Sequence, residues 1–404
     1  MRQALVLVGG RGTRLGALAH DTPKPLMPIA GDKRFLDYLL EHLARFGLRE
    51  ALLLAGHLGE QIEARYSDRT IGAMQLTVIR EASPAGTGGA LHLAAPHLDD
   101  VFVMTNGDSW FDFNLLALAE ALGPKDLAAL ALRQAPDGSR YGTVVFDHGK
   151  IIAFREKDAA QTGPALISGG VYLLRKSALA HIPQPPSSIE QDLFPALAAS
   201  NRLSGKIFGG YFIDIGLPET LAQAQAETPL VARRPAVFFD RDGCLNQDDG
   251  YTHRVEDLRW IDGAREAVRQ VNDAGWLAIV ATNQGGIGKG LYDEAAMHRF
   301  HAAMQADLAA IGAHIDAFYF NPYHPEAVIQ DLRRADHPDR KPNPGMLLAA
   351  ARDWPIAMEA SFLIGDQDSD LAAAAAAGVG GVKFTGGRLD ACLTGRLKAH
   401  RPIA

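Results

Sequence analysis

The sequence predicts an α/β protein with two domains in one chain. Its 404 residues exceed what one ordinary hydrophobic core holds. Apolar runs alternate with amphipathic segments along the chain, which is typical of parallel sheets covered by helices. An apolar run followed by a loop with glycine and charge occurs twice, as "LVLVGGRGTRL" from Leu5 and as "FFDRDGCLN" from Phe238. Because the second copy begins past the middle of the chain, we expect each to open its own domain.

Composition excludes several classes of protein. The chain is 47% hydrophobic and 22% charged, which indicates a globular protein. A net charge of −7 disfavours a broad nucleic-acid surface but permits local basic pockets for phosphates. Two cysteines, Cys244 and Cys392, imply no disulfide framework and favour a reducing cytoplasm. No apolar run is long enough for a membrane span or a signal peptide, so we expect no membrane partner.

Six apolar runs predict buried strands, and each ends at glycine, aspartate or asparagine. They are residues 4–10, 50–56, 101–108, 235–243, 277–286 and 361–366. Amphipathic segments such as 35–47 predict helices between them. In parallel α/β sheets ligands bind beyond the carboxyl ends of the strands, so the polar residues that end these runs are candidate site residues.

The boundary between the domains is predicted by proline and arginine. A helix expected over 219–227 gives way to Thr228, Pro229, two arginines and Pro235. The sequence therefore predicts a first domain over 1–227, a linker over 228–234 and a second domain over 235–404.

The first glycine-rich loop is a candidate phosphate site. Glycines let backbone N–H groups approach a phosphate closely, and arginine offers a fixed fork of donors. The residues concerned are Gly9, Gly10, Gly12, Thr13 and Arg14. Lys24, between two prolines in "TPKPLMPI", is a candidate positioned cation. A plain tight turn and a solvated lysine are the alternatives at this point.

Taken together, these stretches resemble the sugar-1-phosphate nucleotidyltransferases. "GGRGTRLG" and "TPKPLMPIAG" are followed in the family's order by "EASPAGTGGAL", "NGDSW", "FREK", "GGVYLL" and "FIDIGLPETL", over about 1–226. The resemblance implies a Rossmann-like mixed sheet, a phosphate cradle at Gly9, Gly10, Gly12 and Thr13, and charge neutralisation by Arg14 and Lys24. It also implies base recognition by Glu81, Pro84, Gly86 and Thr87, and a sugar pocket with Gly142, Glu156, Lys157 and Gly170.

Two aspartates match the magnesium ligands of that family. Asp108 ends the run "VFVMTNGD", and Asp214 lies in "GYFIDIG". Mg²⁺ binds few carboxylates together with phosphate and water oxygens, which agrees with this pair. Either residue alone could be a turn residue or a helix cap. The implied reaction is attack of a sugar 1-phosphate oxygen on the α-phosphorus of a nucleoside triphosphate, with release of pyrophosphate.

The second loop places Asp240 and Asp242 after an apolar strand. Residues two apart on a strand can face the same way, so one carboxylate could attack phosphorus while the other handles a proton. An aspartate-rich turn is the alternative reading. Thr282 and Asn283 in "LAIVATNQGG", Lys341 in "RKPNPGM", and Asp366 and Asp370 in "FLIGDQDSD" supply the wider context.

These four elements resemble the haloacid-dehalogenase phosphatases. The resemblance implies that Asp240 is the nucleophile, that Asp242 is the general acid and base, and that Thr282 and Lys341 hold the phosphoryl oxygens. It implies a second Mg²⁺ held by Asp240, the carbonyl of Asp242 and Asp366, with Asp370 in support. No long segment separates the motifs, so we expect a parallel sheet without a large cap.

Further stretches over about 235–381 resemble the heptose bisphosphate phosphatase branch, near histidinol phosphatase. The resemblance places Asn246, His253, Asn283 and Arg340 in the substrate pocket. Many members of this branch bind a structural zinc through thiolates. Here Asn321, Tyr323, His337 and Asp339 stand at those positions, so no structural zinc is expected.

The two resemblances together predict a bifunctional enzyme. The first domain is most similar to heptose 1-phosphate guanylyltransferases, so GTP and heptose phosphates are the expected substrates and Mg²⁺ the expected cofactor in both domains. One alternative is a nucleotidyltransferase for another sugar 1-phosphate, of the mannose or N-acetylmuramate type, fused to a histidinol-phosphate or other sugar-phosphate phosphatase. Another is that one domain is an inactive binding module.

Overall fold

The chain folds into two compact units. The computed structural model describes residues 1–138, 142–155 and 163–400. The first unit is Met1–Leu230, and the second begins at Val231. The division lies within 228–234.

The segment predicted as a linker is largely helical, which differs from the expectation. Helix α5 runs over Pro218–Ala232 with Pro229 inside it. Proline in a helix interior loses a hydrogen bond and clashes with the preceding turn. Thr228 and Val231, on either side of it, have no exposed surface. Burial of these side chains stabilises the last turn where the local sequence disfavours it.

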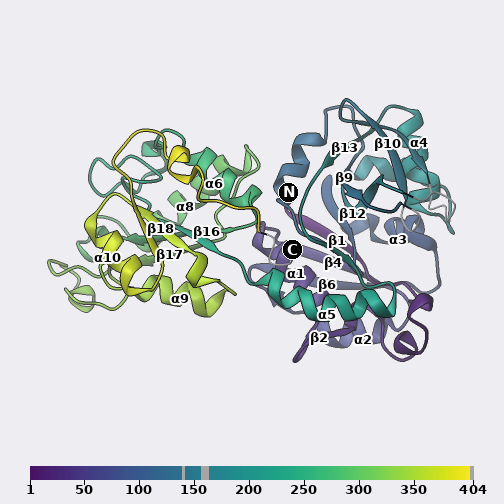
Figure 1. The fold of residues 1–404 in the computed structure, drawn as a ribbon, viewed down its shortest axis with the longest axis horizontal. Coiled ribbons are helices and arrows are strands. Elements are labelled where there is room, and N and C mark those ends of the chain that lie inside the picture. Colours follow the sequence, from purple (N-terminus) through teal and green to yellow (C-terminus); the bar gives the residue numbers. More distant parts are fainter. Residues whose placement is uncertain (139–141, 156–162, 401–404) are drawn as a thin grey trace. The chain divides into compact units, whose positions relative to one another are not determined.

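The first unit contains one ten-stranded mixed sheet, in the order β10-β11-β13-β9-β12-β7-β1-β4-β6-β5. Strands β7, β1, β4 and β6 are mutually parallel, β13 is parallel to β9, and β12 is antiparallel to both β7 and β9. Figure 1 shows this sheet with its covering helices. The strands are β1 Gln3–Leu7, β4 Glu50–Ala55, β5 Thr70–Ile71, β6 Met74–Arg80, β7 Val101–Asn106, β9 Ala128–Ala135, β10 Thr143–Asp147, β11 Lys150–Arg155, β12 Ala165–Arg175 and β13 Leu203–Ile207.

Alternation along the strands divides the side chains between the two faces of this sheet. Leu5, Leu52 and Leu54 pack in a core with Leu91 of α3 and Phe194 of α4. The helices of this unit are α1 Phe35–Arg45, α2 Gly59–Tyr66, α3 Gly86–Ala94, α4 Phe194–Ala199 and α5. The helix expected over 35–47 is confirmed as α1, and the runs at 4–10, 50–56 and 101–108 form β1, β4 and β7.

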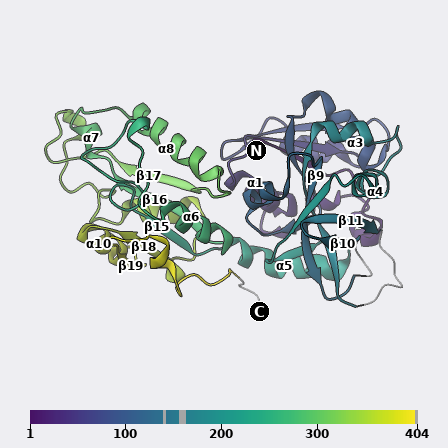
Figure 2. The same ribbon diagram turned by 90° about the horizontal axis from the view of Figure 1, so that it is seen from above.

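The second unit is a three-layer sandwich around a parallel sheet of order β17-β16-β15-β18-β19. Val237, Phe239 and Val280 face a core with α6 and α8, while Phe238 and Ile279 face a core with α9 and α10. Figure 1 shows these helix pairs on the two sides of the sheet, and Figure 2 shows α6, α8 and α10 in a view turned by 90°. The elements are β15 Ala236–Phe239, β16 Leu277–Asn283, β17 Ala317–Asn321, β18 Phe362–Gly365, β19 Gly380–Lys383, α6 Ala264–Asp273, α7 Gly285–Gly288, α8 Glu294–Ala309, α9 Gly345–Asp353 and α10 Asp368–Ala376.

All strands of the second unit that lie within the described residues belong to this single sheet. Among the described residues, no helix has the length and apolar character needed to cross a bilayer.

Candidate active sites

Two short strands bring together the aspartates predicted for the first site. Strand β8, Ser109–Phe111, pairs antiparallel with β14, Phe212–Asp214, so that Asp214 lies opposite Ser109. The amide of Ile215 donates to the carbonyl of Asp108 at 3.0 Å. Asp108 and Asp214, far apart in the sequence, are therefore neighbours at the end of β7.

Lys24 lies between these two carboxylates. Its Nζ pairs with Asp108 Oδ2 and lies 3.8 Å from Asp214 Oδ1, and the residue is 6% exposed. Gly216 permits the close packing here, since a Cβ at that position would lie 2.6 Å from Asp214 Oδ1, 3.1 Å from Arg14 Nη2 and 3.3 Å from Lys24 Nζ. Arg14, Lys24 and Asp214 thus gather around one glycine, and Asp108 joins them through its ion pair with Lys24.

Burial and like charge disfavour ionisation of Asp214. Desolvation raises the pKa of its carboxyl group, and the charge of Asp108 raises it further, while Lys24, the Gly216 amide and Arg14 lower it. Two carboxylates held this close favour a bound cation, which Lys24 supplies in part. Magnesium fits this arrangement, since it takes one or two carboxylates and completes its shell with phosphate and water oxygens.

The glycine loop and the predicted base segment meet beside β1, β4 and β6. A Cβ on Gly9 would lie 2.8 Å from the amide nitrogen of Gly56, and one on Gly56 would lie 3.3 Å from Glu81 Oε2. Desolvation raises the pKa of Glu81, while a backbone hydrogen bond from Ala85 lowers it. Gly10 has open space around its Cα, and Gly12 packs against Ala19 and Lys24. Thr13 opens the short helical segment Thr13–Ala19 that follows Gly12.

The base segment is also fixed from the other side. Thr87 Oγ1 accepts a hydrogen bond from the amide of Ile189 at 3.0 Å. Gly86 lies so close to Ser187 that a Cβ would be 2.3 Å from its carbonyl oxygen. Pro84 is exposed in the turn that precedes α3. Pro84 in this segment is therefore exposed to solvent, whereas Gly86 and Thr87 are held by their contacts with residues 187 and 189.

The predicted sugar residues are only partly described. Gly170 lies against Asn106 at the end of β7, with a Cβ position 3.0 Å from Asn106 Nδ2. The carbonyl of Gly142 accepts from the amide of Ser168 at 3.2 Å. Glu156 and Lys157 lie outside the described residues.

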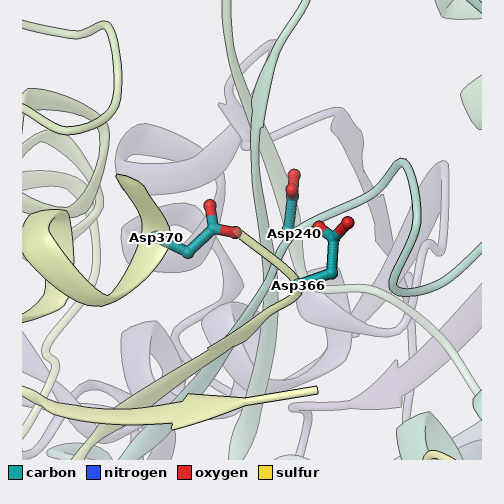
Figure 3. Close-up of side chains that lie close together, drawn as sticks. All are labelled: Asp240, Asp366 and Asp370. Carbon is teal, nitrogen blue, oxygen red and sulfur yellow. The ribbon is translucent and has the colours of Figure 1, made fainter. Parts of the chain in front are cut away.

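In the second unit, three carboxylates gather at the carboxyl ends of β15 and β18. Asp240 follows β15, Asp366 follows β18 and Asp370 lies in the first turn of α10. Figure 3 shows the three side chains close together, and each offers an oxygen within 4.8 Å of the others. Gly243 allows this approach, since a Cβ there would lie 2.7 Å from Asp366 Oδ2.

Lys341 is the cation of this cluster. Its Nζ lies 2.8 Å from Asp240 Oδ1 and 2.6 Å from Asp370 Oδ1. Asn283 fixes its backbone in both directions, because Asn283 Nδ2 donates to the Lys341 carbonyl and the Lys341 amide donates to Asn283 Oδ1, both at 3.1 Å. The structure thus gives Asn283 a positioning contact with Lys341, and its predicted contact with the substrate stays a prediction.

The charges of this cluster do not balance by themselves. Three carboxylates and one ammonium leave a formal charge of −2. Burial raises the pKa of Asp240 to about 7; the charge of Asp370 raises it and Lys341 lowers it. Asp366 Oδ1 is buried with no hydrogen-bond partner among the described residues. A divalent cation would balance the charge and use this oxygen, so the residues fit Mg²⁺.

Asp242 lies beside this cluster and is held by three side chains. Arg241 donates from Nε to Oδ1 at 2.9 Å and from Nη2 to Oδ2 at 2.8 Å. Asn246 Nδ2 donates to Oδ1 at 3.0 Å, and Gln284 Nε2 donates to Oδ2 at 2.8 Å. Asn246 was expected to line the substrate pocket. The structure buries it completely and turns its amide toward Asp242, because the loop after Asp242 folds back over it.

Both units of the chain match known proteins. The nucleotidyl transferase family model matches residues 3–229. The chain therefore belongs to the nucleotidyl transferase family. A guanylyltransferase of Campylobacter jejuni, named D-glycero-alpha-D-manno-heptose 1-phosphate guanylyltransferase, is 35% identical over 218 residues, which are 54% of this chain and 96% of that protein. The crystal structure of HddC from Yersinia pseudotuberculosis matches with a TM-score of 0.51 and 29% identity, covering 56% of this chain and all of HddC.

The second unit matches a different set of known proteins. A HAD-hydrolase-like family model matches residues 339–402. A protein of Rhodopseudomonas palustris named D-glycero-beta-D-manno-heptose-1,7-bisphosphate 7-phosphatase is 43% identical over 164 residues, which are 40% of this chain and 90% of that protein. The expected fusion of a nucleotidyltransferase with a phosphatase is confirmed.

A pocket of about 730 Å³ lies in the phosphatase unit. His253, predicted for substrate binding, lines it and stacks on Tyr292 with ring centroids 4.3 Å apart and an interplanar angle of 11°. Arg254 and Arg299 add positive charge to the wall, and Glu256 and Asp293 add negative charge. Tyr292 donates to Gln284 Oε1 at 2.6 Å, which links the pocket wall to Asp242.

The positions at which zinc ligands would stand form a cluster of ordinary polar and aromatic contacts. Tyr323 stacks on His337 with centroids 3.8 Å apart and an angle of 8°. Asn321 Nδ2 lies 3.2 Å from His337 Nδ1, and that nitrogen also lies 3.2 Å from the amide of Asp339. Arg340 donates to the carbonyl of Tyr323 at 2.8 Å. This clasp, Asn321–Tyr323–His337–Asp339, holds the loop that leads into Lys341.

Sequence reasoning missed three residues around Asp242. Arg241 stands between the two predicted aspartates, and Gln284 directly follows Asn283, so their positions in the motifs could have marked them. Tyr292 gave no signal, because only the fold carries it to the pocket wall.

Proposed function

We propose that the two units catalyse consecutive steps in the synthesis of a nucleotide-linked heptose. The phosphatase unit removes the 7-phosphate of heptose 1,7-bisphosphate, and the nucleotidyltransferase unit transfers GMP from GTP to heptose 1-phosphate. The observation that carries this proposal is the joining of relatives of these two enzymes in one chain with both sets of charged side chains assembled. Both cysteines are free, which agrees with a cytoplasmic location.

In the phosphatase unit, the contacts support a covalent route through Asp240. Its carboxylate would attack phosphorus and form an aspartyl-phosphate while the bond to the sugar oxygen breaks. Lys341, already paired with Asp240 Oδ1, would neutralise phosphoryl oxygens. Thr282 Oγ1 accepts from Gln284 Nε2 at 2.9 Å, so its own proton is free for a phosphoryl oxygen. Asp242 would protonate the leaving oxygen and later take a proton from the attacking water.

In the nucleotidyltransferase unit, Arg14 and Lys24 lie where they could offset charge on the triphosphate as pyrophosphate leaves. The loop at Gly9, Gly10 and Gly12 offers backbone N–H groups to the phosphates. A crystal structure of HddC from Yersinia pseudotuberculosis complexed with GMP-PN also matches this chain, with a TM-score of 0.50 and 29% identity. This supports a guanine nucleotide as the substrate here.

Asp108 and Asp214 would hold one magnesium ion, and Asp240, Asp366 and the carbonyl of Asp242 the other. When bound, these ions supply positive charge that lets anionic groups approach anionic phosphates.

The product of the phosphatase unit can be the substrate of the nucleotidyltransferase unit only if both units act on the same anomer of the heptose phosphate. The guanylyltransferase relative is named for the alpha heptose 1-phosphate, whereas the Rhodopseudomonas phosphatase is named for the beta bisphosphate. A Burkholderia mallei relative, 45% identical over 145 residues, is named for the alpha bisphosphate. We propose the alpha anomer for both units, because the product of the first step must be the substrate of the second.

Two matrices of substrates test this proposal. Four nucleoside triphosphates against several sugar 1-phosphates, with pyrophosphate release measured, should single out GTP with alpha heptose 1-phosphate. Alpha and beta heptose bisphosphates and histidinol phosphate, with inorganic phosphate measured, should single out the alpha bisphosphate. Asp240→Asn should abolish phosphate release and keep pyrophosphate release. Preference for another sugar in both matrices would contradict the proposal.

A further inference from the structure

Gln284 lies between two groups of the proposed phosphatase site. It is 1% exposed, and its Nε2 lies within hydrogen-bond distance of both Asp242 Oδ2, at 2.8 Å, and Thr282 Oγ1, at 2.9 Å. One amide group therefore joins the proton-transfer residue to the hydroxyl expected to hold the phosphoryl group. Loss of this amide would therefore remove a hydrogen bond from both Asp242 and Thr282.

The orientation of this amide is fixed by Tyr292. Tyr292 donates from its hydroxyl to Gln284 Oε1 at 2.6 Å, which leaves Nε2 on the side of Asp242 and Thr282. The Tyr292 ring itself stacks on His253 at the wall of the pocket. A chain of direct contacts thus runs from the pocket wall through Tyr292 and Gln284 to Asp242.

The remaining contacts of Asp242 come from fully buried side chains. Arg241 is fully buried, its Nη2 also donates to the carbonyl of Thr252 at 2.7 Å, and its guanidinium lies over the Phe300 ring at 4.8 Å. Asn246 is fully buried as well. Gln284 differs from Arg241 in how it reaches the pocket wall: it contacts the side chain of Tyr292, whereas Arg241 contacts the backbone of Thr252, next to His253.

We propose that Gln284, oriented by Tyr292, is a positioning residue that sets the Asp242 carboxylate for proton transfer. This inference rests on the proposed phosphatase activity. In the first half-reaction the bond from Asp240 to phosphorus forms, the bond from phosphorus to the leaving oxygen breaks, and the proton of Asp242 passes to that oxygen. In the second, the oxygen of water attacks phosphorus, the bond between phosphorus and the Asp240 oxygen breaks, and inorganic phosphate leaves. The water gives a proton to Asp242, so Asp240 is again a carboxylate and Asp242 again a protonated carboxyl group.

The proposal makes a claim about leaving groups. A sugar alkoxide is a strong base and needs the proton of Asp242, whereas p-nitrophenolate leaves without one. If Gln284 acts through Asp242, its loss should slow formation of the aspartyl-phosphate from alkyl phosphates and spare that step for p-nitrophenyl phosphate. Hydrolysis of the aspartyl-phosphate should slow for every substrate, because water still needs a base.

The test compares Gln284→Leu and Tyr292→Phe with the unaltered full-length chain. The substrates are heptose 1,7-bisphosphate, fructose 1,6-bisphosphate as a second alkyl phosphate, and p-nitrophenyl phosphate. For Gln284→Leu we expect kcat on the alkyl phosphates to fall about 100-fold, within the range of general acid–base contributions, with KM within about twofold. With p-nitrophenyl phosphate, rapid mixing should show one equivalent of p-nitrophenolate released at the unaltered rate and then a slow steady state. Tyr292→Phe should show the same pattern, with kcat on the alkyl phosphates reduced about 10-fold.

Gln305→Leu is the matched control. Gln305 is in the same unit and makes two hydrogen bonds with the backbone of Ile315, away from the carboxylate cluster. Its loss should alter stability and leave the ratio between leaving groups unchanged.

The outcomes separate this inference from the function on which it rests. An equal loss on all three substrates in the first turnover, or no loss, would overturn the role of Gln284. Activity of the unaltered chain on fructose 1,6-bisphosphate and p-nitrophenyl phosphate but not on the heptose substrate would overturn the proposed substrate alone, and those two compounds would still decide about Gln284.

Discussion

Replacement of Lys341 by methionine isolates the charge at the centre of the phosphatase cluster. Methionine keeps an unbranched chain of similar length but removes the ammonium that lies 2.8 Å from Asp240 and 2.6 Å from Asp370. Lys341 is 4% exposed, so water cannot replace it readily. Each contact is worth about 6 kcal/mol of gross attraction at an effective dielectric constant of about 20. Desolvation opposes most of this, and removal of one partner from a buried pair costs about 3–5 kcal/mol.

Two measurements follow from this magnitude. The free energy of unfolding of the phosphatase unit, measured in guanidinium with a chelator present, should fall by about 3–5 kcal/mol. Tryptophan fluorescence reports on this unit, since Trp260, Trp276 and Trp354 lie in it and only Trp110 lies in the other. Phosphate release should fall at least about 1000-fold, which corresponds to about 4 kcal/mol of transition-state stabilisation.

Lys383→Met provides the control for these measurements. Lys383 pairs with Asp368 on the surface, where its side chain is 39% exposed and that of Asp368 is 90% exposed. An exposed pair contributes about 0–1 kcal/mol, so this variant should keep its stability and its phosphatase activity. A stability loss below about 1 kcal/mol for Lys341→Met, or phosphate release like that of Lys383→Met, would refute the reasoning.

Three further predictions concern other parts of the chain. Asp108→Ala should abolish pyrophosphate release and leave phosphate release unchanged; loss of both activities in folded protein would contradict two separate sites. Burial lowers the pKa of His301 to about 3, so this residue takes up a proton on unfolding between pH 6.5 and 3. The free energy of unfolding should therefore fall as the pH falls through this range, by up to about 1.4 kcal/mol per pH unit. In urea unfolding, His301→Gln should show a weaker dependence of stability on pH. Parallel curves of stability against pH for the variant and the unaltered chain would contradict the role of His301. The clasp around His337 contains no thiolate, so chelators should not unfold the phosphatase unit. Tyr323→Ala, which removes the ring stacked on His337, should lower both the melting temperature of this unit and its phosphatase kcat. Unfolding by a zinc-selective chelator would show the clasp to be a metal site.

Much of both sites was predictable because the residues concerned end strands. An apolar run followed by aspartate, asparagine or glycine marks the carboxyl end of a buried strand, and parallel pairing brings such ends to one edge. The structure confirms the strands over 236–239, 277–283 and 362–365 where those runs were found. Asp240, Thr282 and Asp366 follow or end these strands, so local sequence determined their neighbourhood.

Contacts between distant segments depended on the tertiary structure. Asp108 meets Asp214 through the pairing of two three-residue strands, which carry too little periodicity to be recognised in a sequence. The last turn of α5 forms through Pro229 because Thr228 and Val231 are buried, and burial outweighs the local preference.

The sequence by itself determined the fold class, the order of the motifs and the residue types that chemistry requires, because these follow from hydrophobic periodicity and from side-chain charge. Only the tertiary structure decided which donor faces which carboxylate. It placed the amides of Asn246 and Gln284 in hydrogen bonds to Asp242, and the amide oxygen of Asn283 in a hydrogen bond from the Lys341 backbone. The physical reason is that a hydrogen bond requires its two groups within about 3 Å of each other. Strand register and loop packing set that distance, and neither is encoded in any short stretch of the chain.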